Sequence, residues 1–153
     1  MCGALTVRLT DRQGQVVHHK QYKNHIVTSG RQLVAQLFAG QAGGVPKTQV
    51  THMAVGTDAT DPTDTDTALL AERDPRKTIE NINYEEIDEG GVQRVRTRLT
   101  AVFDFGEASG TVPLREAGIF TADADGVMYN RVVFDPVTKT DAFKLTLLWD
   151  IVF

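Results

Sequence analysis

The chain has 153 residues, of which 41% are hydrophobic and 24% are charged. This size and composition indicate one globular domain and exclude a disordered chain. We divide the domain into an N-terminal hairpin over 1–23 and a main body over 24–153. No apolar run approaches the roughly 20 residues of a membrane span, and the N-terminus lacks the apolar segment of a signal peptide. The single cysteine, Cys2, excludes an internal disulfide and a cysteine-based zinc site.

Charge is distributed unevenly along the chain, although the net charge is only −4. Residues 1–57 contain six Lys or Arg, one acidic residue and all four histidines, whereas residues 58–153 contain ten Lys or Arg and nineteen acidic residues. Such charges can mix on the surface of one molecule or meet between copies. The polarity therefore makes docking between subunits one hypothesis.

The N-terminal residues predict a β-hairpin. Apolar and polar residues alternate over 5–9, as they do in a strand with one buried face. A turn is expected at 11–14, after which 16–22 can return as the second strand. If this hairpin lies at a sheet edge, it could add a strand to a neighbouring molecule.

A helix is predicted next, over about 29–39. Thr28 or Ser29 can cap its N-terminus, because hydroxyl side chains accept hydrogen bonds from the free N–H groups there. Gly40 suits the position after the last turn, where the backbone often takes a positive φ. The glycine-rich residues 41–46 are expected to form a loop.

The middle of the chain predicts a short strand over 50–55 and then a polar, Asp-rich loop over 57–67. A single helical turn is expected over 68–72. Pro75 should stop it, since proline cannot donate to a helical hydrogen bond.

The remainder of the chain predicts strands. We expect them over residues 78–84, 92–105, 114–121, 127–134 and 142–153, with an acidic turn over 85–91. The apolar run at 147–153 indicates that the last strand is buried on both faces. Together these elements predict a mainly β (α+β) fold, an antiparallel β-sandwich of about seven to nine strands with one main helix packed on it.

Carboxylates are concentrated in the Asp-rich loop. The weak calcium candidates are Asp58, Asp61, Asp64 and Asp66. Calcium takes six to eight oxygen ligands, but the spacing here is not that of an EF-hand and the loop contains Pro62. A solvated loop with Asx turns is the favoured interpretation, and no metal or other cofactor is expected.

The histidines give little support for a metal site. His18 and His19 are adjacent in a predicted strand, so their side chains point to opposite faces. His18 and His25 could converge only through the tertiary fold. His52 has apolar neighbours and is expected to be half-buried and hydrogen-bonded.

No enzyme motif is present. The sequence contains no nucleophile elbow, P-loop or dinucleotide-binding glycine motif. Its two serines, Ser29 and Ser109, are expected in a helix cap and a turn. The carboxylates Glu107 and Glu116 could form a pair, but pairs of this kind are common in a chain with twenty acidic residues. We therefore expect neither catalysis nor a small-molecule substrate.

A basic stripe is predicted on the strand over 92–105, where Arg94, Arg96 and Arg98 project from one face. A pI of about 5.5 does not match the basic footprint of a nucleic-acid-binding domain, so nucleic acid is not an expected partner. The arginines are expected to pair with acidic residues, either within the sheet or across a subunit boundary. They are interface candidates.

The segment over 114–120 contains adjacent opposite charges, Arg115 and Glu116, whose side chains should point to opposite faces of a strand. One of them must then face the core or an interface, where a charge needs a partner. The first interpretation is a strand bulged near Gly118 with one ion pair inside the sheet. The second makes Arg115 and Glu116 interface candidates.

Several segments follow one another in a characteristic order. They are NHIVTSG at 24–30, VTHMAVGT at 50–57, DTAL at 66–69 followed by Glu72 and Arg73, LREAGIF at 114–120, YNR at 129–131 and TKT at 138–140. In this order the chain resembles small virion proteins of tailed bacteriophages and the N-terminal part of phage tail-collar fibre proteins, which fixes a tail fibre to the baseplate. The similarity covers most of the chain, including the N-terminal hairpin.

The resemblance implies a non-enzymatic structural protein of the virion, assembled in the host cytoplasm. In the fibre proteins, receptor-binding repeats follow this domain, whereas this sequence ends at Phe153. We therefore expect an adaptor or fibre-attachment module in the tail, baseplate or collar. Its expected partners are further copies of itself, as a trimer or hexamer, and neighbouring tail or baseplate proteins.

Two alternatives remain open at this point. One is a head, capsid-decoration or neck protein, which the sequence does not separate from a tail protein. The other is a receptor- or glycan-binding module, which would need an exposed aromatic cluster on loops. The aromatic residues available for one are Tyr22, Tyr84, Tyr129 and Trp149, of which Trp149 is expected in the core.

Overall fold

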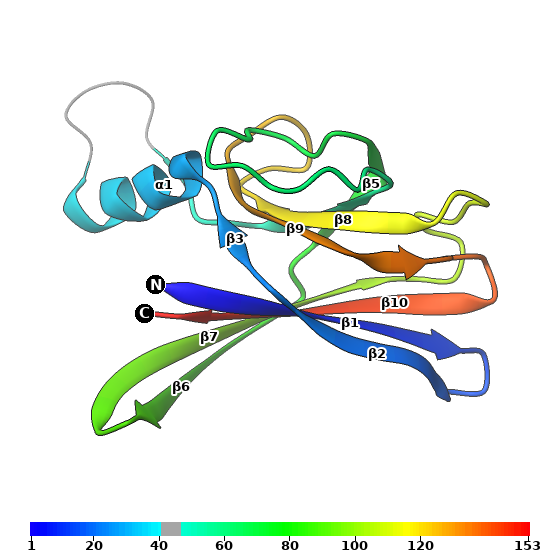
Figure 1. Ribbon diagram of the computed structural model, residues 1–153, viewed down its shortest axis with the longest axis horizontal. Coiled ribbons are helices and arrows are strands. Elements are labelled where there is room, and N and C mark those ends of the chain that lie inside the picture. Colours follow the sequence, from blue (N-terminus) through cyan, green and yellow to red (C-terminus); the bar gives the residue numbers. More distant parts are fainter. Residues whose placement is uncertain (41–46) are drawn as a thin grey trace.

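The computed structural model describes residues 1–40 and 47–153 (Figure 1). The elements in chain order are β1 (Cys2–Asp11), β2 (Val16–Lys23), β3 (His25–Ile26), α1 (Thr28–Ala39), β4 (His52–Gly56), β5 (Glu72–Thr78), β6 (Asn81–Glu89), β7 (Val92–Phe103), β8 (Leu114–Phe120), β9 (Met128–Val137) and β10 (Phe143–Val152). The predicted loop over 41–46 lies outside the described residues.

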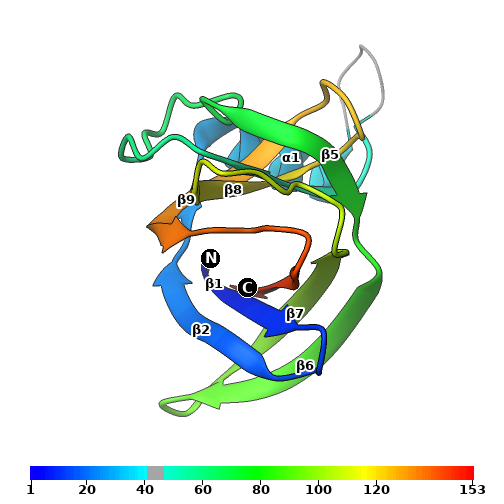
Figure 2. The ribbon, with the colours of Figure 1, turned by 90° about the vertical axis from the view of Figure 1, so that its right-hand side faces the viewer.

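Two five-stranded antiparallel sheets face each other (Figure 2). The first sheet has the order β2-β1-β10-β7-β6, and the second has the order β3-β9-β8-β4-β5. The helix α1 packs beside β9, at one end of the second sheet. These observations confirm the mainly β sandwich with one helix, with ten strands where seven to nine were expected.

The core lies between the two sheets. The first sheet contributes Leu5, Phe103 and Trp149, and the second contributes Met53 and Ile119, all of them fully buried. Because β10 lies between β1 and β7, it is a central strand whose backbone pairs on both sides. The prediction that Trp149 belongs to the core is confirmed. The prediction that the last strand is buried on both faces is wrong, because its alternate residues Leu148, Asp150 and Val152 are only partly buried.

The N-terminal hairpin is also confirmed. β1 pairs with β2 from Ala4↔Lys23 to Thr10↔Val16, and its other edge pairs with β10 along its whole length. This places β2 at the edge of the first sheet. The alternation that predicted the hairpin reflects this position, because one face of β1 packs on the second sheet and the other faces solvent.

The predicted helical turn over 68–72 is wrong. In its place the chain enters β5 at Glu72, and Pro75 lies inside that strand. β5 is the outermost strand of the second sheet, where one side of the backbone has no neighbouring strand. Proline is tolerated there because its missing N–H removes no ladder hydrogen bond.

The predicted acidic turn over 85–91 is wrong as well. Residues up to Glu89 belong to β6, and the turn consists of Gly90 and Gly91, both with positive φ. Two glycines favour a tight reversal between antiparallel strands, and the Asp88 carboxylate accepts a hydrogen bond from the Gly91 N–H at 2.8 Å. Of the acidic residues, Glu85 instead lies opposite Arg96 of β7, and Glu89 forms an ion pair with Arg94.

The helix begins without the predicted side-chain cap. Its N-cap is Val27, and Ser29 Oγ donates to the Met128 carbonyl oxygen at 2.8 Å, which ties α1 to β9. Gly30 lies against Tyr129, whose carbonyl oxygen would be 1.9 Å from an added Cβ. The Ser29 hydroxyl, which the sequence predicted as a helix cap, therefore bonds to a neighbouring strand instead. The expected positive φ of Gly40 is confirmed at 75°.

Candidate functional site

An apolar cleft of about 430 Å³ opens between α1 and the core-facing side of the β6–β7 hairpin. Figure 1 shows this hairpin extending away from α1 at the end of the sandwich where both termini lie. The cleft is lined by Leu33, Val34, Leu37, Gln49, Val50, Ile82, Tyr84, Val95, Thr97, Leu99, Tyr129, Ile151 and Phe153.

The cleft arises because the first sheet is longer than the second. Along β7, Leu99 is buried under the second sheet, while Val95 on the same face is 43% exposed. On β6, the neighbouring Ile82 and Tyr84 are 47% and 75% exposed. The apolar face of the β6–β7 hairpin therefore extends beyond the second sheet that covers the core. An exposed apolar face of this kind is a candidate binding surface.

The polar groups in the cleft are few. The Tyr129 hydroxyl donates to Met1 Sδ at 3.1 Å, and burial raises the pKa of Tyr129. Among the described residues that line the cleft there is no Asp, Glu, His, Lys, Arg, Ser or Cys side chain. The lining therefore favours an apolar group as the occupant, held by packing and by the surrounding tyrosines.

The cleft should bind an amphiphilic dye while the protein is folded. We expect the fluorescence of anilinonaphthalene sulfonate to rise when it is added to the native protein, because apolar surface shields the dye from water. Val95→Glu should remove most of this signal by placing a charge in the cleft. Val112→Glu, at another exposed valine outside the cleft lining, should leave it unchanged. Equal loss in both variants would show that the dye binds elsewhere.

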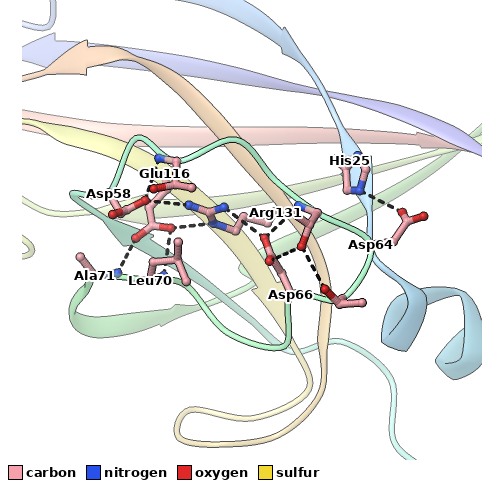
Figure 3. A network of polar contacts seen from close by, with 11 residues as sticks. His25, Asp58, Asp64, Asp66, Leu70, Ala71, Glu116 and Arg131 are labelled. Carbon is pink, nitrogen blue, oxygen red and sulfur yellow. Dashed lines mark hydrogen bonds and ion pairs between the residues drawn. The ribbon is translucent and has the colours of Figure 1, made fainter.

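The Asp-rich loop surrounds a buried arginine. The Arg131 side chain is fully buried on β9, and its three nitrogens contact three carboxylates (Figure 3). The distances are 2.8 Å from Nε to Glu116, 3.1 Å from Nη1 to Asp66 and 3.3 Å from Nη2 to Asp58. Three carboxylates of different segments thus converge on one guanidinium, whose fork of donors suits several acceptors at once.

Glu116 fastens the same loop to β8. Its carboxylate is fully buried, accepts the Arg131 bond and also accepts hydrogen bonds from the backbone N–H groups of Leu70 at 3.2 Å and Ala71 at 2.8 Å. Gly56 leaves room for it, since an added Cβ would be 2.4 Å from Glu116 Oε1. Buried charges are tolerated when each is paired and hydrogen-bonded in this way.

The weak calcium candidates do not gather around one cation position. Asp58 and Asp66 both contact Arg131, so the guanidinium supplies the positive charge between them. Asp64 contacts His25 and Arg31, and Asp61 is exposed. The part of the chain that the structure describes contains no group of three or more His, Cys, Asp or Glu placed to hold a metal ion.

Two of these carboxyl groups have lowered pKa values. Backbone and side-chain hydrogen bonds from Thr60, together with Arg131, lower the pKa of Asp58. Burial raises the pKa of Asp66, but hydrogen bonds from Thr63 and Arg131 outweigh it and leave that pKa below its ordinary range. In both cases the folded protein favours the ionised carboxylate.

The Asp66 carboxylate should make the protein sensitive to acid. Because its pKa is lower in the folded state, its contribution to stability is present above pH about 4 and is lost as the pH falls through the folded pKa. We expect Asp66→Asn to lower the free energy of unfolding at pH 7 and to flatten its decline below about pH 4. Urea titrations across this range would measure both effects. Parallel curves for the two proteins would contradict the assignment, and Asp61→Asn is the matched control.

The histidines occupy separate places. His25 Nε2 lies 3.1 Å from Asp64, and His52 Nδ1 lies 2.8 Å from the Thr51 hydroxyl. His18 is partly buried on β2, and the adjacent His19 is exposed. The expectation that His52 is half-buried and hydrogen-bonded is confirmed.

The arginine stripe of β7 pairs within the first sheet. Arg94 contacts Glu89 at 3.0 Å, Arg96 contacts Glu85, and Arg98 contacts Asp150 of β10 with two bonds of 2.7 Å. Of the two predicted pairings, within the sheet or across a subunit boundary, these contacts confirm the one within the sheet. The sequence did not reveal these acidic partners, because Glu85 and Glu89 were assigned to a turn and Asp150 lies on a strand whose neighbours the sequence did not predict.

Arg115 and Glu116 separate as predicted, and the register of β8 shifts between Leu114 and Glu116. Arg115 is partly exposed. Glu116 is buried in an ion pair with Arg131, so its role as an interface candidate is wrong and the first interpretation, a bulged strand with an internal ion pair, is the observed one. The reason is that the carboxylate has no exposed surface to offer to another subunit.

Lys139 is a further buried charge that sequence reasoning did not single out. Its Nζ donates to the carbonyl oxygens of Asp104, Phe105 and Thr140 at 2.8, 3.1 and 3.2 Å, and Ser109 Oγ lies at 3.3 Å. Burial lowers the pKa of Lys139. With its protons directed at these acceptors, the amine acts as a structural cation that joins two loops and not as a base for Ser109.

None of the helices in the described part of the chain has the length and apolar character needed to cross a membrane. Comparisons with protein-family models, with curated proteins and with solved structures found no match to this chain.

Proposed function

We propose that the protein is a non-enzymatic structural protein of a tailed-bacteriophage virion, a component of the tail, baseplate or collar that acts as an adaptor or fibre-attachment module. In this role it is assembled in the host cytoplasm and docks to copies of itself and to neighbouring tail or baseplate proteins. It needs no cofactor, nucleic acid or membrane.

The observation that carries the proposal is the open apolar cleft between α1 and the β6–β7 hairpin. It leaves Ile82, Tyr84, Val95 and Phe153 between 43% and 75% exposed, and Phe38 on the adjacent helix is 91% exposed. Contiguous apolar surface of this kind is typical of a protein that is covered by a partner. The class of partner comes from the resemblance of the ordered segments to small virion proteins and tail-collar fibre proteins.

Location in the particle is the direct test. Antibody raised against the purified protein, used for gold labelling of isolated tailed particles from the source strain, should mark the tail, the baseplate or the neck region. Mass spectrometry of the same particles should find the chain. Labelling of the head would favour the decoration protein, and absence from purified particles would overturn the proposal.

A receptor- or glycan-binding module is the second candidate, favoured by the exposed Tyr84 beside the cleft. Aromatic faces on a protein surface pack against apolar faces of ligands such as sugars. A glycan array probed with the purified protein separates the two candidates. Specific binding that Tyr84→Ser abolishes would favour this module.

A further inference from the structure

The two edges of the first sheet carry opposite charges. β2 and β6 are its outermost strands, so each has one backbone edge without a neighbouring strand in that sheet (Figure 2). Exposed residues on β2 include His19, Lys20 and Lys23, whereas those on β6 include four acidic residues and no basic one. The basic N-terminal part of the sequence thus forms one edge of this sheet, and an acidic segment from the remainder forms the other edge.

Some of these charges have no ion-pair partner among the described residues. Lys23 and Glu86 are both exposed and make no salt bridge there. Lys20 contacts Asp135 of β9, and Glu85 contacts Arg96 of β7. Each edge therefore keeps unneutralised charge, and edge strands with free N–H and C=O groups are templates for strand addition.

Chain direction allows the two edges to meet. Each of the four strand pairings that join β2 to β6 is antiparallel, so β2 and β6 run in the same direction. A rotation about an axis along the strands would place β6 of one copy beside β2 of the next as a parallel pair. The sheet would then continue from one molecule into the next with the same face inward.

One register matches the charges on both faces. If Lys20 lies beside Glu86, then His19 lies beside Glu85 and Lys23 lies beside Glu89. The faces also agree, because Lys20 is opposite buried Val7 on β1 and Glu86 is opposite Val95 in the cleft, so both are on the core-facing side.

We propose that the protein self-associates head to tail, with β2 of one copy pairing in parallel with β6 of the next to form a closed ring. This deepens the proposed function by naming the partner, a second copy, and the surface that holds it. Two β6 edges or two β2 edges facing each other would bring like charges together, which opposes a symmetric dimer through either edge. The same electrostatics predict that assembly weakens as salt is raised.

Engineered cysteines test the register directly. In a Cys2→Ser background, Gln21→Cys and Ile87→Cys introduce two uncharged positions that the register places side by side on the outer face. Within one chain they lie at opposite edges of the sheet, so a disulfide between them must join two copies. Air oxidation of the double variant should give a ladder of covalent multimers, whereas either single variant should stop at the dimer. A double variant that behaves like the singles would overturn the register.

Light scattering tests the assembly without cysteines. At low ionic strength the natural chain should have the mass of about three to six chains. Glu86→Lys should reduce this to one chain, while Asp123→Lys, at an exposed turn of the second sheet, should not. Circular dichroism would verify that both variants fold. A natural chain that stays monomeric at high concentration and low salt would overturn the ring, but particle labelling would still decide the proposed function separately.

Discussion

Removing residues 147–153 is expected to abolish cooperative folding. This truncation deletes most of β10, the central strand of the first sheet, together with the fully buried side chains of Leu147 and Trp149 and the nearly buried Ile151. Burial of each such side chain contributes about 1.5–3 kcal/mol, and the total stability of a domain is only about 5–15 kcal/mol. The strands β1 and β7 would also lose their common neighbour.

Urea or thermal unfolding followed by circular dichroism is the measurement. A matched pair of leucines supplies the control, because Leu147 is fully buried and the adjacent Leu148 points to the other face. Leu147→Ala should cost about 2–5 kcal/mol, and Leu148→Ala should cost clearly less. A soluble truncated chain with a cooperative melting transition would contradict the central role of β10.

Replacing Arg131 with methionine should lower the free energy of unfolding by about 3–5 kcal/mol. The substitution keeps a long apolar stem but leaves the fully buried Glu116 carboxylate without its ion-pair partner. Asp58 and Asp66 lose the same contact, so the loop over 57–71 should also become more accessible to proteases.

Two further variants distinguish a lost buried ion pair from a general loss of packing. Adding Glu116→Gln to Arg131→Met removes the uncompensated charge, and the double variant should regain part of the lost stability. Arg94→Met breaks an exposed pair with Glu89 and should cost at most about 1 kcal/mol. If Arg131→Met and Arg94→Met cost the same in urea titrations, the buried network is not the stabilising element inferred here.

Fold class was accessible from the sequence because alternation and turn residues report which face of a strand is buried. The alternation in β1 and in the C-terminal half of β7 follows the packing of the two sheets. The predictions of the turns over 68–72 and 85–91 were wrong because the same local residues are compatible with two different structures. Pro75 can end a helix or lie in an edge strand, and consecutive acidic residues can form a turn or face arginines across a strand pair.

The candidate site was far less predictable. Val95 and Leu99 belong to one alternating strand, so nothing local distinguishes the exposed residue from the buried one. The difference arises because the second sheet ends before the first does. Likewise Asp58 and Asp66 looked like possible ligands for a cation, and only the fold supplied the cation, Arg131 from β9.

By itself, the sequence determined the hairpin, the helix, the presence of an apolar last strand and the segregation of charge along the chain, because these depend on neighbouring residues and on periodicity. The tertiary structure decided which charges are buried in pairs, which apolar residues remain uncovered in the cleft, and that the basic and acidic segments form opposite edges of one sheet. Each of these depends on segments far apart in the chain, which strand order brings together and local patterns do not encode.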